Sequence, residues 1–585
     1  MLEAAGWMGL PARKITICDR SSINQLVNES GGRECCVAIS IEALTFLRQL
    51  SPPEVLQDLI ENAWAKLLVF SVGRSRPYRD LFGWLTSGAV SGLVPQKDTR
   101  VFQLPEGGRR FSRTFAGQSF VVKHPLPLST FDLRDADNRD VEKILLADER
   151  PMFLRTERGS CELFLLALSQ LPDINERLSP NRGVEEYYDQ LIPLLIFLRH
   201  CFEERCWHGA GSTARLIIDD PLLDRNYGLL DYAILRNSMR SAGYGTSIAF
   251  IPWNHRRTSK KKAARIFDQD PNLSICVHGC DHSNNEFDEE DLGSLRWKID
   301  TGLRRMEQHR SRTSLAFDPI MVFPQGRFSS SAMQALRTSD YVAAVNTTCF
   351  PTNAGAKPLT VADFLRPAIT KFHGFPLFPR RYPRRLIEFA FDIFIGRPVL
   401  IVQHHEDFHD GCRHLEDFVR NLYKLEPKLT WGALSDQLIQ SCLIRSTSEC
   451  SMEVRFFTRQ FRFKNTRSSR TGLVFSKEEP DSAAIRSVHV DGKSVPFSFR
   501  DGFLTFERDA EAGQVIDVRI QDSSMSRSPA PKRPGVTHTV GVYMRRAMSE
   551  FRDNTLIRYP RLLAAATELA TRMKITGKDD REEQP

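Results

Sequence analysis

The chain has 585 residues, 41% apolar and 26% charged, as in ordinary globular proteins, and at roughly 150 residues per domain this length predicts three or four domains. Its net charge of +8 is spread along the chain and not concentrated on one element, which argues against a nucleic-acid partner. No run of about 18 apolar residues predicts a membrane span, the first 20 residues lack the apolar segment of a signal peptide, and the twelve cysteines form no framework, so a cytoplasmic protein is expected.

Residues 1–195 are expected to form an α/β domain. Short apolar runs at 37–41, 67–72, 119–122 and 163–166 predict strands, and helical patterns lie between them. Strands that alternate with helices favour a parallel sheet. The region contains neither a phosphate-binding loop nor a nucleophile elbow, and no function is assigned to it.

Residues 196–447 repeat a unit in which a short apolar run precedes a helical stretch, a pattern typical of a (β/α) barrel or an open parallel sheet. Such folds collect functional residues at the carboxyl ends of their strands. The sequence therefore predicts one site at a shared rim. The runs end in residues that bind metals or move protons: 215–218 before Asp219 and Asp220, 273–277 before His278, 320–323 before Pro324, and 399–402 before Gln403, His404 and His405.

Residues 448–522 alternate apolar and polar positions and contain Asp-Gly turn signals at 491–492 and 501–502, which predicts a small antiparallel β domain. Residues 523–585 are expected to form a linker over 523–534, then a helix and a disordered tail. The helix is predicted from four apolar residues that recur at helical spacing and are expected to pack on another domain: Leu562, Ala566, Leu569 and Met573.

Two basic runs lie within the predicted barrel region. They are interpreted as solvated loops or, alternatively, as contacts with an anionic glycan or phosphate. The first contains Arg256, Arg257, Lys260, Lys261 and Lys262, and the second contains Arg380, Arg381, Arg384 and Arg385.

His278 and His282 have the spacing of a metal site. Two histidines four residues apart, directly after a strand, can converge on one ion if the chain turns there, and Gly279 makes such a turn easy. Neutral imidazole is the commonest protein ligand for zinc and related ions. The alternative is that both rings are ordinary hydrogen-bonded histidines. A structural zinc site that also uses Cys276 and Cys280 is disfavoured, because an extended strand cannot wrap around one ion.

Asp219 and Asp220 would supply what two histidines lack. A carboxylate completes a three-ligand site with an open position for water, the pattern of a catalytic metal. Because adjacent side chains point in different directions, one carboxylate can bind the ion while the other takes a proton from the water. A compatible alternative is that the pair caps a helix with Pro221 in its first position. The expected cofactor is one divalent ion, with zinc as the first choice.

His404 and His405 follow the last predicted strand and offer a proton donor. General acid–base help of this kind is worth about 10²–10⁴ in rate. Period-two alternation sends the two rings to opposite sides of the strand, so only one of them can reach a substrate. A solvent-exposed loop is the alternative interpretation.

Taken in order, these motifs resemble the NodB-like polysaccharide deacetylases, or carbohydrate esterase family 4: an Asp-Asp pair after a strand, His-x-x-x-His, a Pro-x-Gly turn, and a strand that ends in histidine. The resemblance covers about 250 of the 585 residues. It implies a distorted (β/α) barrel of polysaccharide-deacetylase type, here preceded by an α/β domain and followed by a small antiparallel β domain.

The resemblance also implies a role for each motif residue. Asp219 would be the base, and His404, with His405 close behind it, the acid. The metal ligands would be Asp220, His278 and His282, and the substrate groove would be shaped by Pro324, Gln325, Gly326 and Arg327, with a backbone N–H of Gln325 at the oxyanion.

Two positions depart from the family pattern. Val322 stands where the family has an arginine that orients the base, and Gln325 replaces an aromatic residue that lines the sugar site. Arg327 and Arg366 are the candidate substitutes for the arginine. The sequence thus predicts a metal-dependent hydrolase that removes N-acyl or O-acyl groups from a carbohydrate. The alternative is a non-catalytic protein that binds a glycan or a partner through the same groove.

Overall fold

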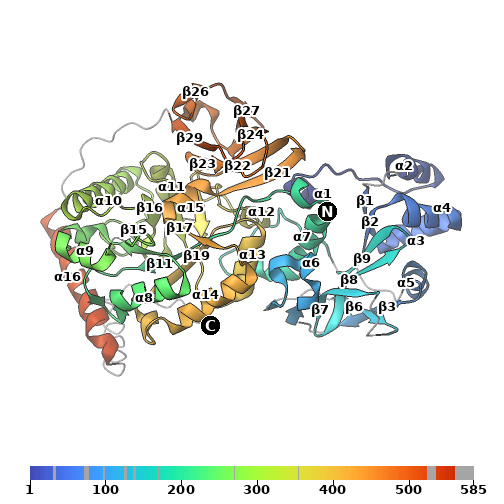
Figure 1. Cartoon of the computed structure of the whole chain (residues 1–585), viewed down its shortest axis with the longest axis horizontal. Helices are drawn as coiled ribbons and strands as arrows, with labels where there is room; N and C mark the ends of the chain where they lie inside the picture. Colours follow the sequence, from blue (N-terminus) through green and yellow to red (C-terminus); the bar gives the residue numbers. More distant parts are fainter. Residues whose placement is uncertain are drawn as a thin grey trace.

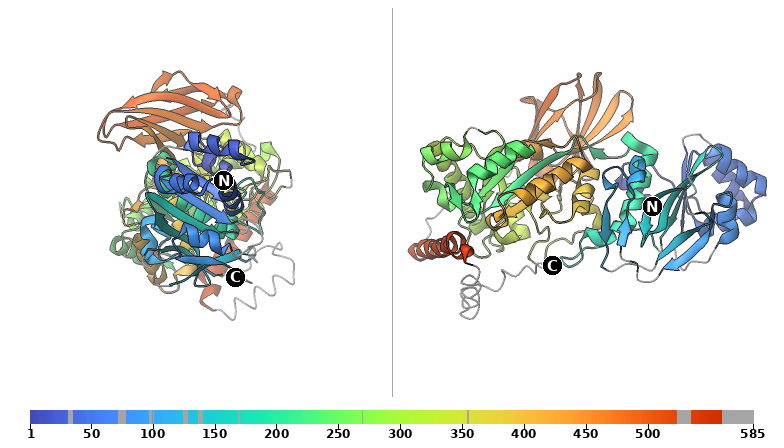
Figure 2. Two further views of the ribbon diagram at one scale, coloured as in Figure 1. Left: turned by 90° about the vertical axis from the view of Figure 1, so that its right-hand side faces the viewer. Right: turned by 60° about the horizontal axis from the view of Figure 1, so that its bottom comes forward.

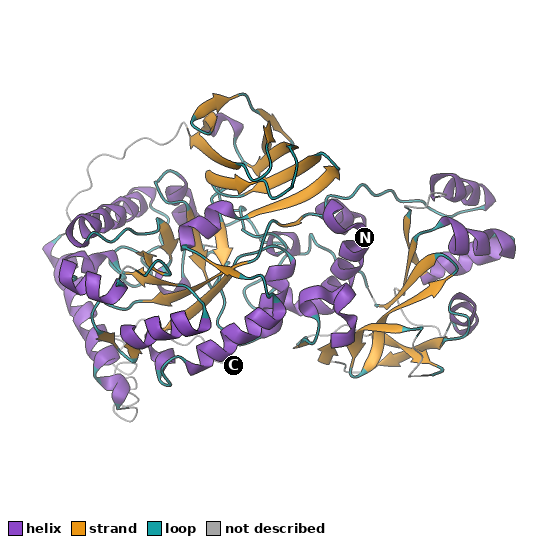
Figure 3. Ribbon diagram, in the orientation of Figure 1, coloured by secondary structure: helices purple, strands orange, loops and turns teal. Residues whose placement is uncertain are grey.

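The computed structural model describes residues 1–559 except 31–34, 72–77, 97–98, 100, 124–127, 136–139, 169, 269, 354 and 523–534. Figure 1 shows three folded parts: an amino-terminal sheet with its helices, a central barrel, and a β-sandwich beside the barrel. Figure 3 separates their helices from their strands. Within these described ranges, no helix is long and apolar enough to cross a membrane.

The amino-terminal sheet is mixed, and not parallel as the sequence pattern favoured. Its order is β1-β2-β9-β8-β7-β4-β5; β1, β2 and β9 run parallel, and the other pairs run antiparallel. A separate antiparallel pair joins β3 to β6. The strands are β1 (Cys36–Ser40), β2 (Lys66–Ser71), β3 (Val90–Gln96), β4 (Val101–Gln103), β5 (Ser119–Val121), β6 (Leu128–Leu133), β7 (Glu142–Ala147), β8 (Arg150–Arg158) and β9 (Cys161–Ala167), and the helices are α1 (Leu2–Trp7), α2 (Arg20–Ser30), α3 (Ile41–Leu50), α4 (Pro53–Asp58), α5 (Arg79–Leu85), α6 (Arg109–Ser112) and α7 (Tyr188–Phe202).

Helix α7 joins this sheet to the barrel. It is apolar around its whole circumference and almost entirely buried, as expected for a helix that packs on both sides. The ring of Phe197 lies 5.3 Å from that of Phe164 on β9, measured between centroids, and Tyr188 stacks on Phe391 of barrel helix α13 (Leu386–Phe394) at 4.6 Å. One hydrophobic cluster therefore runs from the amino-terminal sheet into the barrel.

The central sheet is entirely parallel and curls into a barrel, which confirms the main feature of the expected fold. Its order is β18-β17-β16-β15-β14-β11-β19, with β20 beside β11. The edges meet at one parallel bridge between Arg381, just after β18, and Ile401 of β19. The elements are β11 (Thr213–Asp219), β14 (Thr246–Phe250), β15 (Leu273–His278), β16 (Ile320–Val322), β17 (Ala343–Asn346), β18 (Leu377–Pro379), β19 (Val399–His404), β20 (Thr430–Trp431), α8 (Tyr232–Ala242), α9 (Lys260–Phe267), α10 (Leu292–Thr313), α11 (Ser330–Arg337), α12 (Val361–Phe364), α13 (Leu386–Phe394), α14 (Arg413–Leu425) and α15 (Leu434–Gln440); the small strands β12 (Asn226–Tyr227) and β13 (Leu230–Asp231) pair with each other.

Burial explains the barrel sequence. Strands β11, β14 and β15 are almost wholly buried, so they read as continuous apolar runs without alternation. The surrounding helices need only one apolar stripe; α14, for example, buries Leu415, Val419 and Leu422. Side chains at helix starts complete the hydrogen bonding, with Asp231 capping α8 and Asp291 capping α10.

The β-sandwich packs a six-stranded sheet, β10-β21-β22-β24-β28-β27, on a four-stranded sheet, β23-β29-β25-β26, around its own apolar cluster. All pairs are antiparallel, as expected, except β22 with β24, which run parallel. The strands are β10 (His208–Gly209), β21 (Cys442–Ser448), β22 (Ser451–Phe456), β23 (Gln460–Lys464), β24 (Thr471–Glu478), β25 (Ile485–Val490), β26 (Lys493–Val495), β27 (Ser498–Arg500), β28 (Phe503–Ala510) and β29 (Val515–Asp522).

Helix α16 (Val536–Asn554) follows the sandwich, in the region where a helix was expected after the linker, but it lies ahead of the apolar stripe on which that expectation was based. Figures 1 and 2 show it at the end of the barrel farthest from the amino-terminal sheet. The predicted linker at 523–534, the predicted tail and the predicted helix with Leu562, Ala566, Leu569 and Met573 lie outside the described residues.

Candidate metal site

The three predicted metal ligands converge at the carboxyl rim of the barrel. Asp220 follows β11, His278 ends β15, and His282 lies in the loop after β15; one ligand atom from each lies within 4.8 Å of the others. Oδ1 of Asp220 is 3.4 Å from Nε2 of His278 and 3.1 Å from Nε2 of His282. The structure therefore brings the three side chains to one point.

This donor set suits a divalent ion such as zinc. Metal–ligand bonds of about 2.0–2.2 Å place neighbouring ligand atoms roughly 3–3.5 Å apart, which matches the two separations around Asp220. Its Oδ1 atom is buried and accepts no hydrogen bond from any described residue. Two imidazoles and one carboxylate leave a coordination position open, as in catalytic and not structural zinc sites.

The electrostatics of Asp220 and His282 favour this interpretation. Burial opposes the ionisation of Asp220, but His282 and His278 outweigh it and hold the pKa of the carboxyl well below its usual value. Burial lowers the pKa of His282 and favours neutral imidazole, the form that binds metals. For His278, Asp219 and Asp220 outweigh burial and raise the pKa of the ring.

The backbone aims these ligands. Nδ1 of His278 lies 3.1 Å from the carbonyl oxygen of Val322, which leaves Nε2 facing Asp220. Asp220 and His282 have positive φ angles of 77° and 54°. Such conformations are unfavourable for residues with a side chain and concentrate at functional sites.

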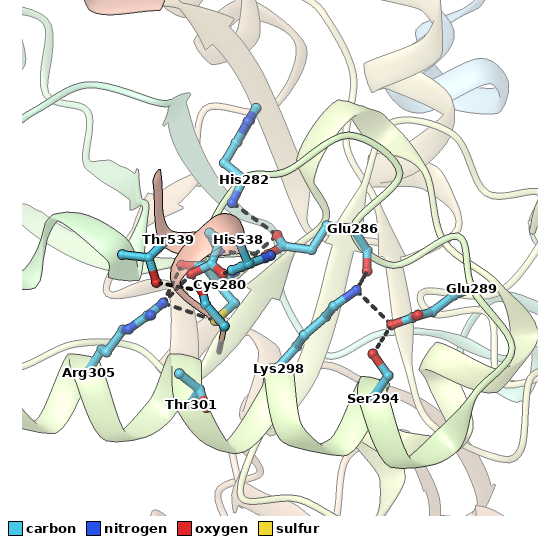
Figure 4. A network of polar contacts seen from close by, with 12 residues as sticks. Cys280, His282, Glu286, Glu289, Ser294, Lys298, Thr301, Arg305, His538 and Thr539 are labelled. Carbon is cyan, nitrogen blue, oxygen red and sulfur yellow. Dashed lines mark hydrogen bonds and ion pairs between the residues drawn. The ribbon is translucent and has the colours of Figure 1, made fainter. Parts of the chain in front are cut away.

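Glu286 holds the loop that carries His282. Its buried carboxylate accepts hydrogen bonds from the backbone N–H groups of Cys280 (3.1 Å), Asp281 (2.6 Å) and His282 (3.2 Å), part of the network in Figure 4. Gly279, with a φ of 62°, leaves room for this carboxylate, because a Cβ there would lie 2.3 Å from its Oε2 atom. Sequence reasoning missed this role of Glu286, because it depends on backbone amides that only the folded loop turns inward.

A second group of possible ligands lies beside the first. Cys280, Asp281 and Glu286 also offer ligand atoms within 4.8 Å of one another. However, Glu286 is occupied by the loop amides, and Asp281 forms ion pairs with Arg305 and with His538 of α16, the latter at 2.9 Å (Figure 4). These partners give the group a structural role.

Asp219 lies next to the ligands but meets a different partner. Its carboxylate forms a two-pronged ion pair with Arg380, with distances of 2.7 and 2.5 Å, and both side chains are buried. Burial raises the pKa of Asp219, but Arg380 outweighs it and lowers the pKa below the usual value, so the carboxylate is ionised. The expected substitutes for the family arginine were wrong: Arg327 pairs with Asp288, and Arg366 pairs with Glu478.

His404 and His405 meet different surroundings at the end of β19. His404 is the register partner of Asp219 on the neighbouring strand, is half-buried, and has its Nε2 atom 3.2 Å from the hydroxyl of Tyr382. His405 is 5% exposed, and its Nε2 atom lies 3.5 Å from Asp553 of α16. His404 thus stays beside Asp219 at the rim, whereas His405 is engaged by the carboxy-terminal helix.

The predicted groove residues form a tight turn, η7 (Pro324–Gly326), after β16. Gln325 has a φ of 58°, and its side chain accepts a hydrogen bond from the backbone N–H of Asn285 at 3.1 Å. Arg327 forms a 2.6 Å ion pair with Asp288. Both contacts tie the turn to the loop that follows β15.

No protein-family model and no curated protein matches this chain. Solved structures similar to it include a family 4 carbohydrate esterase from Streptomyces lividans in complex with acetate (11% identity, 39% of this chain and 94% of that chain, TM-score 0.25). A second is the Xyl-CE4 domain of a multidomain xylanase from the hindgut metagenome of Trinervitermes trinervoides (10% identity, 39% of this chain and 89% of that chain, TM-score 0.25). A third is a family 4 pseudoenzyme from Bacillus anthracis (11% identity, 38% of this chain and 64% of that chain, TM-score 0.24). All three are described as carbohydrate esterase family 4 proteins, the family that the sequence motifs resemble.

Proposed function

We propose that this protein is a metal-dependent hydrolase that removes an acyl group, bound through nitrogen or oxygen, from a carbohydrate. The observation that carries the proposal is the convergence of Asp220, His278 and His282 beside a second, ionised carboxylate, Asp219. A divalent ion held by the three ligands, with zinc as the expected ion, would act as a Lewis acid. It would lower the pKa of water enough for the water to lose a proton near neutral pH and attack an acyl carbonyl.

The chain's own residues divide the proton transfers between them. Asp219 is ionised and oriented by Arg380, so it can accept the proton of the attacking water. His404 stands on the neighbouring strand and is accessible at the rim, which suits it to donate a proton to the departing amine or alcohol. The turn at Gln325 would offer a backbone N–H to the oxyanion.

Metal content and acetate release, measured on the same preparations, test the two aspartate roles. We expect about one zinc ion per chain in the wild type. Asp220→Asn should lose the ion. Asp219→Asn should keep the ion and lose about 10²–10⁴ in turnover of acetylated oligosaccharides, because only the proton acceptor is removed.

His404→Ala and His405→Ala form a matched pair for the same assay. Both should keep the ion, and turnover should fall mainly in His404→Ala. If Asp219→Asn lost the ion and Asp220→Asn kept it, the two roles would be reversed. A wild type that holds zinc but releases no acetate from any acetylated sugar would favour the non-catalytic alternative, a glycan-binding or partner-binding protein.

A further inference from the structure

Helix α16 lies against the rim that carries the candidate metal ligands. Nε2 of its His538 is 2.9 Å from Asp281, the residue before ligand His282. Near its other end, Asp553 accepts a 2.7 Å hydrogen bond from the hydroxyl of Tyr227, the last residue of β12. Positions 538, 542, 546, 550 and 553 recur at helical spacing, so one face of α16 points at the rim. Arg546 lies at the centre of that face.

Two nitrogen atoms of the Arg546 guanidinium group are buried without a partner among the described residues. The residue is 5% exposed, and its Nε and Nη2 atoms make no hydrogen bond with any described residue. Several buried arginines elsewhere use their N–H groups: Arg380 pairs with Asp219, Arg397 pairs with Asp392, and Arg215 donates to serine hydroxyls and backbone carbonyls. Buried N–H groups of a cation without an acceptor are strongly unfavourable, so this position calls for an acceptor, and an anion would also compensate the charge.

Two contacts of α16 place Arg546 at the rim that carries the candidate metal site. Eight residues before it, His538 contacts Asp281, the neighbour of ligand His282. Seven residues after it, the carboxylate of Asp553 lies 3.5 Å from Nε2 of His405, just after β19. Arg546 therefore lies on the inward face of α16, between two points at which the helix contacts the rim.

The carboxylates along α16 already have partners. Glu550 pairs with Arg257 across the rim, and Asp553 is bound by Tyr227 and Arg552. Asp219, at the base of the site, is neutralised by Arg380. None of these three carboxylates is left over for Arg546, and an added divalent ion would increase the positive charge further.

We propose that Arg546 binds an anionic group of the substrate, so that the acyl sugar acted on at this site carries a carboxylate or a phosphate. The inference deepens the proposed function and rests on it for the reaction, but not for the binding. The planar guanidinium fork matches both anions with two parallel hydrogen bonds. Helix α16 thereby supplies a specificity residue to a site whose other residues come from the barrel.

Calorimetric titration of the full chain, with and without added zinc, tests the inference. The probes are N-acetylglucosamine, its 6-phosphate, and N-acetylmuramic acid, which are neutral, phosphorylated and carboxylated versions of one sugar. We expect at least one anionic sugar to bind about tenfold to hundredfold more tightly than the neutral one, with an affinity that falls as salt rises. The two anionic probes tell carboxylate from phosphate.

Arg546→Gln should remove this preference and leave binding of the neutral sugar unchanged. Arg545→Gln is the matched control, because it removes the same charge from the adjacent position of the helix. Arg546→Lys keeps the positive charge but lacks the planar guanidinium group, so it should bind the anionic sugar with intermediate affinity. This variant tests the inference if Arg546→Gln fails to fold. Equal wild-type affinity for neutral and anionic sugars, or equal losses for both in Arg546→Gln, would overturn the inference. Anion-selective binding without acetate release would overturn the proposed function alone.

Discussion

Asp219 and Asp220 are adjacent residues with the same side chain, yet their carboxylates meet different partners. Asp219 faces Arg380, and Asp220 faces His278 and His282. The positive φ of Asp220 contributes to this division, because it turns the chain just as β11 ends. One residue is thereby neutralised by a protein cation, while the other keeps a free oxygen for an ion.

The pair of Asp219 and Arg380 yields a stability prediction. Arg380→Gln would leave Asp219 buried without its counter-charge, which should lower the free energy of unfolding by about 3–5 kcal/mol. Urea denaturation is the measurement. The double variant Asp219→Asn/Arg380→Gln should recover much of the loss, because no charge stays buried. If the double variant lost as much unfolding free energy as Arg380→Gln and Asp219→Asn lose together, the broken ion pair would not explain the loss in Arg380→Gln.

The ligands could be predicted from the sequence, whereas Arg380 could not. Asp220 and His278 end strands of one parallel sheet, and such ends share a rim whatever the loop lengths. Arg380 belongs to a basic run that was interpreted as a solvated loop or a contact with an anion, and nothing in its local pattern reveals a partner 161 residues away. Arg327 and Arg366 were the candidates named for this role, but Asp288 and Glu478 engage them.

At the scale of elements, buried strands were easier to predict than turns and helix faces. The barrel strands are apolar on both sides and stand out in the sequence. The hairpin between β7 and β8 was missed, because its turn has Asp148 and Glu149 at positive φ where glycine or asparagine is usual. The position of helix α16 was not predicted, because its inward face carries His538, Arg546 and Asp553 in place of an apolar stripe.

His309 of helix α10 yields a prediction about how the free energy of unfolding depends on pH. Burial, with smaller contributions from His255 and Arg312, lowers the pKa of His309 from 6.5 to about 4. Its ring lies against Phe250, so the folded state keeps it neutral while the unfolded state takes up a proton below pH 6.5. The contribution of the neutral His309 ring to the free energy of unfolding is therefore fully present above pH 6.5 and is lost as the pH falls towards 4.

Between pH 7 and pH 5, this residue should cost the wild type about 2 kcal/mol of unfolding free energy. His309→Leu should lack that component, so urea denaturation of both proteins at the two pH values isolates it. Parallel losses in wild type and variant would mean that His309 titrates normally in the fold.

At the scale of the whole molecule, buried charges tie the β-sandwich to the barrel. Arg337 of α11 is 3.1 Å from Glu479 and 3.4 Å from Asp522, whose side chains are fully buried in the sandwich. Arg459 also pairs with Asp522, and Lys477 pairs with Glu479 at 2.7 Å. The barrel and the sandwich thus share a polar junction, in contrast to the apolar core that α7 shares with the amino-terminal sheet.

Arg337→Gln should loosen this junction. Removing one cation leaves Glu479 and Asp522 short of counter-charge, and we expect a loss of about 3–5 kcal/mol in unfolding free energy. Hydrogen exchange should rise in β24 and β29 of the sandwich and stay unchanged in β1 and β2. Faster exchange throughout the amino-terminal sheet would show instead that the three parts unfold as one unit.

The position of α16 along the chain has a consequence for biosynthesis. The barrel strands are complete at Trp431, whereas α16 begins at Val536, about 100 residues later. At about 5–20 residues per second, the ribosome needs roughly 5–20 s to add that stretch. During this interval a newly folded barrel has an uncovered rim. If the candidate site binds an ion, that ion could therefore enter before the helix covers the rim, without a later opening of the finished protein.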